Sequence, residues 1–183
     1  MQVTALARSP EKLNELVKTY PDKLKVIQGS IEDAEKVKSV VQLQDWVVNS
    51  LGGGLEVNTV CSAGSALIID AMKQFGVKKT LVVTSFGCND SWNDTALFLR
   101  PIFYLMLRHA LRDKNIQEDH YANSDLEYTI VRPGGLRDTP ATGKYRVGEH
   151  ISSRMVSRED VADFLIKQLE KQEYLRKAVT ISD

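Results

Sequence analysis

The sequence predicts an α/β fold, in which a doubly wound sheet of parallel strands carries helices on both faces. Short apolar runs alternate along the chain with longer segments of helical spacing, which is typical of strands joined by helical crossovers. The runs VVNSL, TLVVTS and YTIVR show little polar alternation, as strands covered on both faces do. No domain boundary is evident, and 183 residues fit one domain over residues 1–183.

In the first half of the chain, apolar runs stopped by turn residues predict strands over residues 2–7, 24–28 and 45–51. Helical spacing predicts helices over residues 10–20, 32–41 and 58–75. Ser9 and Pro10 suit the start of the first helix, and Gly76 suits the C-cap of the third. The residues expected to face inward are Leu13, Leu16, Val17 and Tyr20 in the first helix and Val37, Val40 and Val41 in the second.

In the second half, apolar runs predict strands over residues 80–84, 127–131 and 178–181, with short strand pieces near Tyr145 and Ser152. Helices are expected over residues 96–112 and 114–124, with Pro101 as the place for a kink in the first. A loop over residues 85–95 precedes them, and Ser157 caps a last helix that ends near Glu170. The turn Pro133-Gly134-Gly135 is expected to break the strand before it.

The composition limits the classes of partner. The 24 Lys and Arg residues balance 24 Asp and Glu residues, and this zero net charge argues against nucleic acid or an anionic membrane as the main partner. Cys61 and Cys88 cannot build a disulfide framework and favour a cytoplasmic location. The opening MQVTALAR lacks a signal-peptide core, and Arg100 and Pro101 interrupt the most apolar window. We expect a small-molecule partner, no nucleic acid and no membrane, and the oligomeric state stays open.

The candidate site lies beyond the carboxyl ends of the strands, where ligands bind in open α/β sheets. Arg8, Ser9 and Lys12 follow the first strand and form a compact group that suits a phosphate, next to a helix N-terminus. In a dinucleotide-binding fold this place faces the adenosine ribose, where an arginine favours the 2′-phosphate of NADP. A capping serine followed by solvated charges explains the same pattern equally well.

Three further strand ends carry turn residues or hydroxyls. Glycines after a buried strand let a backbone approach a ligand closely, and a hydroxyl beside a Pro-Gly-Gly turn could border a nicotinamide ring. Tight turns, caps and a flexible loop are the structural alternatives at each end. These candidates are Ser30 and Ile31 after the second strand, Leu51, Gly52 and Gly53 after the third, and Ser85 with Pro133, Gly134 and Gly135 on two neighbouring strands.

Other chemistry-bearing residues receive structural interpretations. Neither GxGxxG nor GxxxxGK[ST] occurs, and the histidines have no metal-ligand spacing, so the sequence predicts no metal site. Cys61 is expected to be a small buried residue, and Glu118 and Asp119 are expected to be solvated helix charges. Phe103, Tyr104 and Met106 are expected in the core. The histidines, His109, His120 and His150, are expected at the surface or on helices.

Three segments resemble the atypical short-chain dehydrogenase/reductase family with an NAD(P)-binding, NmrA-like fold, in the style of flavin reductase (biliverdin-IXβ reductase). They are VTALARSPEKL, VCSAGSALIIDAMKQFGVKKTLVVTSFGCNDS and LEYTIVRPGGLRDTPATGKY, and the resemblance extends over nearly the whole chain. It implies a Rossmann-like fold. It also implies that the chain begins at the family's second strand, without the first strand and the Gly-x-x-Gly-x-x-Gly loop. Residues 2–7 are then expected either to pair directly with residues 45–51 or to detach.

The resemblance assigns roles to the candidate residues. It places Arg8 and Lys12, with Ser9 beside them, on the 2′-phosphate of NADP, and Ser30 where the family has an acidic residue near adenine, with the Ile31 backbone beside it. It places Leu51, Gly52 and Gly53 along the cofactor, Ser85 near the nicotinamide, and Arg132 to Gly135 at the flank of that ring. Lys114 and Glu118 match a Lys-x-x-x-Glu pattern of the family.

One departure from the family bears on activity. The Tyr-x-x-x-Lys pair of carbonyl-reducing short-chain enzymes is absent, since Tyr104 is followed by Arg108 four residues later. The resemblance therefore implies an NADP(H)-dependent reductase that acts on a planar acceptor such as a flavin or quinone, with Ser85 as the catalytic residue. The alternative is a non-catalytic NAD(P)-sensing binding protein of the NmrA type.

Overall fold

The structure is a computed structural model, and it describes residues 1–54, 57–98 and 100–183. The strands are β1 (Val3–Ala7), β2 (Leu24–Gln28), β3 (Trp46–Asn49), β4 (Lys79–Val83), β5 (Glu127–Pro133), β6 (Gly135–Arg137), β7 (Arg146–Gly148), β8 (Met155–Ser157) and β9 (Lys177–Ser182). The helices are α1 (Asn14–Thr19), α2 (Ala34–Val41), α3 (Val60–Phe75), α4 (Arg100–Ala122) and α5 (Arg158–Lys171), with 3-10 turns η1 (Pro10–Leu13) and η2 (Asn89–Asp94). The predicted α/β fold class is confirmed.

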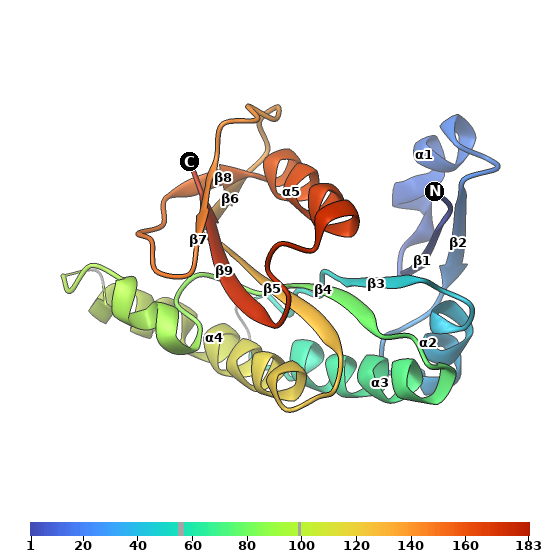
Figure 1. Cartoon of the computed structure of the whole chain (residues 1–183), viewed down its shortest axis with the longest axis horizontal. Coiled ribbons are helices and arrows are strands. Elements are labelled where there is room, and N and C mark those ends of the chain that lie inside the picture. Colours follow the sequence, from blue (N-terminus) through green and yellow to red (C-terminus); the bar gives the residue numbers. More distant parts are fainter. Residues whose placement is uncertain (55–56, 99) are drawn as a thin grey trace.

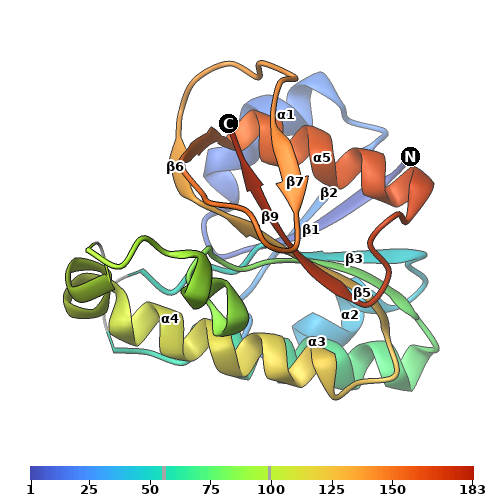
Figure 2. The ribbon, with the colours of Figure 1, turned by 60° about the vertical axis from the view of Figure 1, so that its left-hand side comes forward.

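The main sheet has the strand order β3-β4-β5-β9-β7. Its first four strands are parallel, as predicted, and β7 pairs antiparallel with β9 at the edge. Helices α3 and α4 lie on one face of this sheet and α5 lies on the other (Figures 1 and 2). Both faces of β5 are therefore covered, which explains why Tyr128 to Pro133 are all buried.

The strands β1 and β2 form a separate two-stranded parallel sheet that stands at the β3 side of the main sheet (Figure 1). The expected alternatives for residues 2–7 were direct pairing with the third strand or detachment, and β1 does not pair with β3. Helix α2 connects the two sheets, because its buried Val37 and Val41 belong to the apolar cluster against which Leu6 of β1 and Val47 of β3 pack. Within the described residues, β1 and β3 each keep one unpaired edge.

Several local predictions hold. Gly76 caps α3 in the left-handed conformation, and the Ser157 hydroxyl accepts a hydrogen bond from the Asp160 amide at the start of α5. Val37 and Val41 are buried and Val40 is partly buried, and Cys61 is a buried residue, as expected.

Other predictions are wrong. Residues 100–122 form one helix, and Pro101 lies in its first turn, where a missing backbone N–H costs nothing, so Pro101 does not interrupt the helix. Ser9 makes no side-chain cap, and Leu16 and Tyr20 are about half exposed. Tyr104 and Met106 are exposed at 58% and 62% rather than placed in the core. The expected stop at Pro133-Gly134-Gly135 holds, because β5 ends at Pro133, although the strand runs two residues beyond its predicted end at residue 131.

Candidate functional site

The strand ends that sequence analysis selected come together in two groups. In the main sheet, the hydrogen bonds continue past β4, because the amides of Thr84 and Phe86 donate to the carbonyls of Val131 and Pro133 at 2.8 Å each. Ser85 therefore lies beside the end of β5, next to Pro133. This arrangement confirms that the Ser85 hydroxyl and the Pro133 turn share one edge of the sheet.

The second group lies at the ends of β1 and β2. The amide of Gly29 donates to the carbonyl of Ala7 at 3.1 Å, which sets the turn at Ser30 beside Arg8. The Ser30 hydroxyl accepts from the amide of Glu32 at 3.2 Å and so holds this turn. Arg8 and Lys12 are exposed, and neither side chain makes a hydrogen bond or ion pair with any residue that the structure describes. Both cations can therefore take an anionic ligand without losing a partner.

Ile31 and Leu51 join the two groups. Gly64 of α3 lies so close to them that a Cβ there would overlap with side-chain carbons of both residues. Both also pack against the apolar cluster under β3 and α2. The ends of β1, β2 and β3 are thus held together by side-chain packing in the absence of backbone pairing between β1 and β3.

The glycines of the site differ in the space that surrounds them. A Cβ at Gly52 would meet no protein atom within 4 Å, so this position is open toward a ligand. A Cβ at Gly53 would overlap with the Asn58 side chain, whose amide donates to the Gly53 carbonyl. A Cβ at Gly134 would overlap with the Arg154 carbonyl, and one at Gly135 with the Met155 sulfur. Packing alone therefore accounts for these three glycines, and Gly52 is the one that suits close approach of a cofactor.

Helix α4 contributes residues to which the sequence analysis assigned no role in the site, although Lys114 and Glu118 matched a pattern of the resembled family. The Lys114 ammonium donates to the Leu51 carbonyl at 3.4 Å, at the start of the glycine loop. The buried Asp113 carboxylate accepts from the amides of Cys61 and Ser62 at 2.9 Å each and from the Ser62 hydroxyl at 2.5 Å. Burial opposes ionisation of Asp113, but these hydrogen bonds outweigh it and hold its pKa below the usual range. The Asp113 carboxylate of α4 thereby caps the N-terminus of α3.

Glu118 is the second such residue, and its expected solvation is wrong. Its side chain is 3% exposed and pairs with Arg132, itself 3% exposed, through Nε to Oε1 at 2.9 Å and Nη2 to Oε2 at 2.6 Å. Burial disfavours the charged guanidinium, but the hydrogen bonds and negative charge of Glu118 raise the pKa of Arg132. The sequence did indicate this ion pair, because Arg132 places a charge inside the apolar run YTIVR and a buried arginine requires an acidic partner.

Asn49 at the end of β3 completes the contacts with α4. Its side-chain carbonyl accepts from the Leu51 amide at 3.1 Å, and its amide nitrogen lies 2.9 Å from both the Ser65 and the Tyr121 hydroxyls. Burial raises the pKa of Tyr121 to about 12, so this hydroxyl stays protonated near neutral pH. The network fixes the backbone where the glycine loop leaves the sheet.

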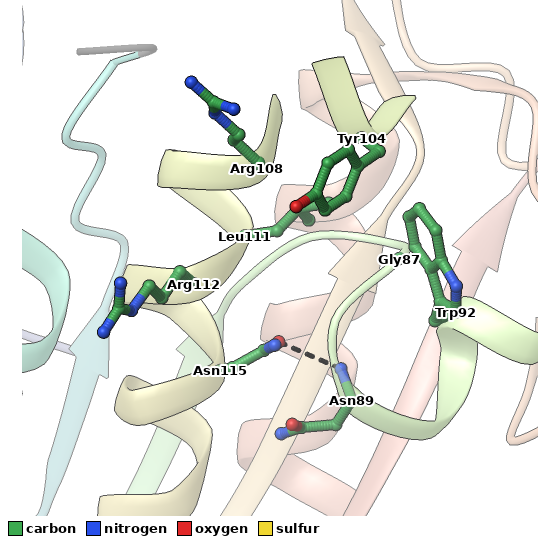
Figure 3. Close-up of a pocket in the computed structure, with 8 residues that line it drawn as sticks. All are labelled: Gly87, Asn89, Trp92, Tyr104, Arg108, Leu111, Arg112 and Asn115. Carbon is green, nitrogen blue, oxygen red and sulfur yellow. Dashed lines mark hydrogen bonds between the residues drawn. The ribbon is translucent and has the colours of Figure 1, made fainter. Parts of the chain in front are cut away.

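A shallow pocket of about 300 Å³ lies on the outer side of α4, against η2 (Figure 3). Trp92 and Tyr104 lie on one side of it, while the Arg108 and Arg112 side chains point away from them. The Asn115 side chain accepts from the Asn89 amide at 3.0 Å and joins α4 to η2. None of the residues that line this pocket is among the predicted site residues, and we assign it no part in the site. Among the described residues, no cluster of His, Cys, Asp or Glu is suited to a metal ion, and no helix has the length and apolarity of a membrane span.

These features fit an anionic dinucleotide. The unpaired cations Arg8 and Lys12 stand at one end of the row of strand ends, Gly52 leaves open space in the middle, and the half-buried Ser85 stands at the other end. The Ser85 hydroxyl has only a local contact, to the Phe86 carbonyl at 3.2 Å, and is available to a ligand.

Comparisons with known proteins identify the family and the fold. A family profile described as NAD(P)H-binding matches residues 1–172. A Bacillus subtilis protein named as an uncharacterized sugar epimerase is 30% identical over 122 residues, which are 66% of this chain and 52% of that protein. An uncharacterized chloroplastic protein of Arabidopsis thaliana is 28% identical over 188 residues, 98% of this chain and 67% of its own length. The chain thus spans about half the length of the first of these relatives and two thirds of the second.

Two solved structures share the fold. ChuY, an anaerobillin reductase from Escherichia coli O157:H7, superposes with a TM-score of 0.81 at 24% identity, over 99% of this chain and 84% of that one. A short-chain dehydrogenase/reductase from Veillonella parvula in complex with NADP gives a TM-score of 0.83 at 19% identity, over 100% of this chain and 83% of the other.

Proposed function

The chain belongs to the NAD(P)H-binding family, and from that premise we propose that it is an NADP(H)-dependent reductase that passes hydride to a planar acceptor such as a flavin or a quinone. The observation that carries this proposal is the row of strand ends itself. Free cations stand where β1 ends, an open glycine follows β3, and an accessible hydroxyl follows β4. This order matches the order of phosphate, ribose and nicotinamide along a dinucleotide.

In this proposal Arg8 and Lys12 hold the 2′-phosphate, with Ser9 beside them and the Ser30–Ile31 turn next to the adenine. Arginine suits a phosphate because its guanidinium can donate two parallel hydrogen bonds. Leu51, Gly52 and Gly53 lie along the ribose, where Lys114 adds a positive charge beside the Leu51 carbonyl.

The nicotinamide supplies the hydride when the cofactor is bound. Pro133, Gly134 and Gly135 border its ring, and the Ser85 hydroxyl donates a hydrogen bond to the acceptor. The exposed Tyr104 has Arg108 rather than a lysine four residues later, so the usual proton donor is absent. Acceptors that take hydride without a strong proton donor suit this site, and flavins and quinones are such acceptors.

A titration of NADPH and NADH against the wild type, Arg8→Ala and Lys12→Ala tests the cofactor assignment. The wild type is expected to prefer NADPH by about tenfold or more, since each charge-assisted contact contributes ~1.5–3 kcal/mol before exposure reduces it. Each variant should lose most of this preference and keep its NADH affinity. Lys18→Ala is the matched control, because it removes an equal exposed charge that pairs only with Glu15 on α1. Equal affinity of the wild type for both cofactors would exclude the assignment.

The absent Tyr-x-x-x-Lys pair equally suits a second function, a binding protein that senses NADP without turnover. Steady-state NADPH oxidation with a panel of flavins and quinones separates the two functions. Turnover with any of these acceptors supports the reductase. Tight NADPH binding with no oxidation above the uncatalysed rate supports the sensor.

A further inference from the structure

The Glu118 carboxylate is a buried acceptor with four side-chain donors. Oε1 accepts from the Thr84 hydroxyl at 2.7 Å and from Arg132 Nε at 2.9 Å. Oε2 accepts from the Asn89 side-chain amide at 2.9 Å and from Arg132 Nη2 at 2.6 Å. Both carboxylate oxygens are thus satisfied by protein donors, and the side chain is 3% exposed.

The donors come from three separate segments of the chain. Thr84 directly precedes Ser85, Arg132 directly precedes Pro133, and Asn89 begins η2. Arg132 also pairs with the half-exposed Asp90 at 2.8 Å. One carboxylate therefore links the ends of β4 and β5 to the segment that follows Ser85.

This geometry does more than stabilise the fold. A buried ion pair can often be replaced by apolar residues of similar volume without loss of stability. An apolar pair would fill the space, but it would not fix the Thr84 hydroxyl, the Arg132 guanidinium and the Asn89 amide relative to one another. Hydrogen bonds to a charged acceptor are short and directional, and so they set these positions.

We propose that Glu118 is the positioning residue for the nicotinamide half of the site, which it organises by holding Thr84 and Arg132 and thereby Ser85 and Pro133. The inference rests on the proposed function. It assigns Glu118 no contact with the cofactor or the acceptor. Arg8 directly follows β1 and Lys12 lies in η1, and neither shares a contact with Glu118, so the adenosine half of the site is independent of this carboxylate.

The test compares two ligands on the full chain. NADPH carries both halves of the cofactor, whereas adenosine 2′,5′-bisphosphate carries the adenosine half with its 2′-phosphate and lacks the nicotinamide. The variants are Glu118→Gln and the double variant Glu118→Leu/Arg132→Met. The double variant removes both buried charges, so it leaves no unpaired arginine that could destabilise the fold. Asp119→Asn is the control, because it removes the neighbouring exposed carboxylate of the same helix.

The double variant is expected to bind adenosine 2′,5′-bisphosphate within about twofold of the wild type and NADPH about tenfold more weakly. Where the protein turns over, kcat should fall about 10²-fold, as expected when reacting groups are misplaced. Without any ligand, the amide NMR signals of Ser85 and Gly134 should move in both variants and stay in place in Asp119→Asn.

Three results would overturn the inference. They are equal loss of both ligands in the folded double variant, retention of NADPH affinity, and unmoved Ser85 and Gly134 signals. A wild type that binds NADPH no more tightly than adenosine 2′,5′-bisphosphate would contradict the proposed function. The ligand-free NMR shifts would still decide whether Glu118 sets the positions of Ser85 and Gly134.

Discussion

Replacing Asp113 by asparagine tests the contact between α4 and the start of α3. The carboxylate accepts two backbone amides at 2.9 Å and the Ser62 hydroxyl at the positive end of a 16-residue helix. Thr59, at the N-cap, makes no side-chain cap, so Asp113 takes the place of the usual local capping group. Asparagine keeps the shape but loses the charge and turns one acceptor into a donor.

The expected loss of stability follows from these contacts. Hydrogen bonds to a charged group contribute ~1.5–3 kcal/mol each, and a partly buried charge at a helix terminus contributes up to about 2 kcal/mol. An asparagine with its oxygen in the place of Oδ1 can keep both hydrogen bonds from Ser62 but loses the one from the Cys61 amide and the negative charge, so we expect Asp113→Asn to lower the free energy of unfolding by about 2–4 kcal/mol. For a chain of this size, that lowers the Tm by roughly 5–15 °C. Asp119→Asn, on the exposed side of the same helix, should change the free energy by less than about 0.5 kcal/mol.

The pH dependence gives an independent check. Because the folded-state pKa of Asp113 is lowered, its contribution is complete above the unfolded-state pKa of about 4 and is lost as the pH falls through the folded-state value. Urea unfolding of wild type and Asp113→Asn should therefore differ most near neutral pH and converge below about pH 4. A difference within about 0.5 kcal/mol at neutral pH, or one that persists in acid, would refute the charge-at-terminus explanation.

Three further outcomes are expected. Gly134→Ala should destabilise the fold by about 1–3 kcal/mol in urea unfolding, because its Cβ would overlap with a backbone carbonyl. Gly52→Ala should leave stability unchanged and weaken NADPH binding. The reverse pattern would show that the two glycines were assigned wrongly. Amide hydrogens of β1 and β3 should exchange faster than those of β4, since each has an unpaired edge, and equal protection of β3 and β4 would contradict the topology. Ser85→Ala should lower turnover about 10²-fold with little change in NADPH affinity; unchanged turnover with weak binding would make Ser85 a binding residue.

The strands could be predicted from the sequence because each is an apolar run with its own stop. Parallel pairing then follows from the helical crossovers, and it places the strand ends at one edge without further information. This is why Ser85 and Pro133 were selected before their positions were known. The free edges of β1 and β3 were one of two outcomes that the resemblance predicted, since residues 2–7 were expected either to pair with residues 45–51 or to detach. The structure shows that β1 does not pair with β3.

Helix α4 could not be predicted as one element, for a physical reason. Hydrophobic periodicity detects a helix that buries apolar side chains, but α4 buries the polar Asp113, Gln117 and Glu118 between the buried Leu111 and Tyr121. The charged run around Asp113 therefore divides the apolar pattern although the backbone continues. The exposure of Leu16 on α1 is the opposite case, because periodicity identifies an apolar face without showing whether another element covers it.

The residues missed in the site share one property: their partners are distant in sequence. Asp113 acts on α3, Lys114 on Leu51, and Glu118 on Thr84 and Arg132. Polar residues on a helix are solvated in most proteins, so pattern alone assigns them to the surface. The charge of Arg132 inside a buried strand indicated that an acidic partner was needed, and the Lys-x-x-x-Glu pattern of the resembled family had singled out Lys114 and Glu118 without giving them a role.

The polar face of α4 has a consequence for the whole site. Asp113, Lys114, Glu118 and Tyr121 lie within three turns of one rigid helix, and their contacts reach the start of α3 and the ends of β3, β4 and β5. The distances between those ends are therefore set by the fixed rise of the helix as well as by the sheet. In the proposed function the nicotinamide half of the cofactor spans β3 to β5, where it meets groups whose spacing is already determined, so we expect little ordering when it binds. Changes on the buried face of α4 should consequently alter nicotinamide placement, whereas changes at Arg8 or Lys12 should alter only the choice between NADP and NAD.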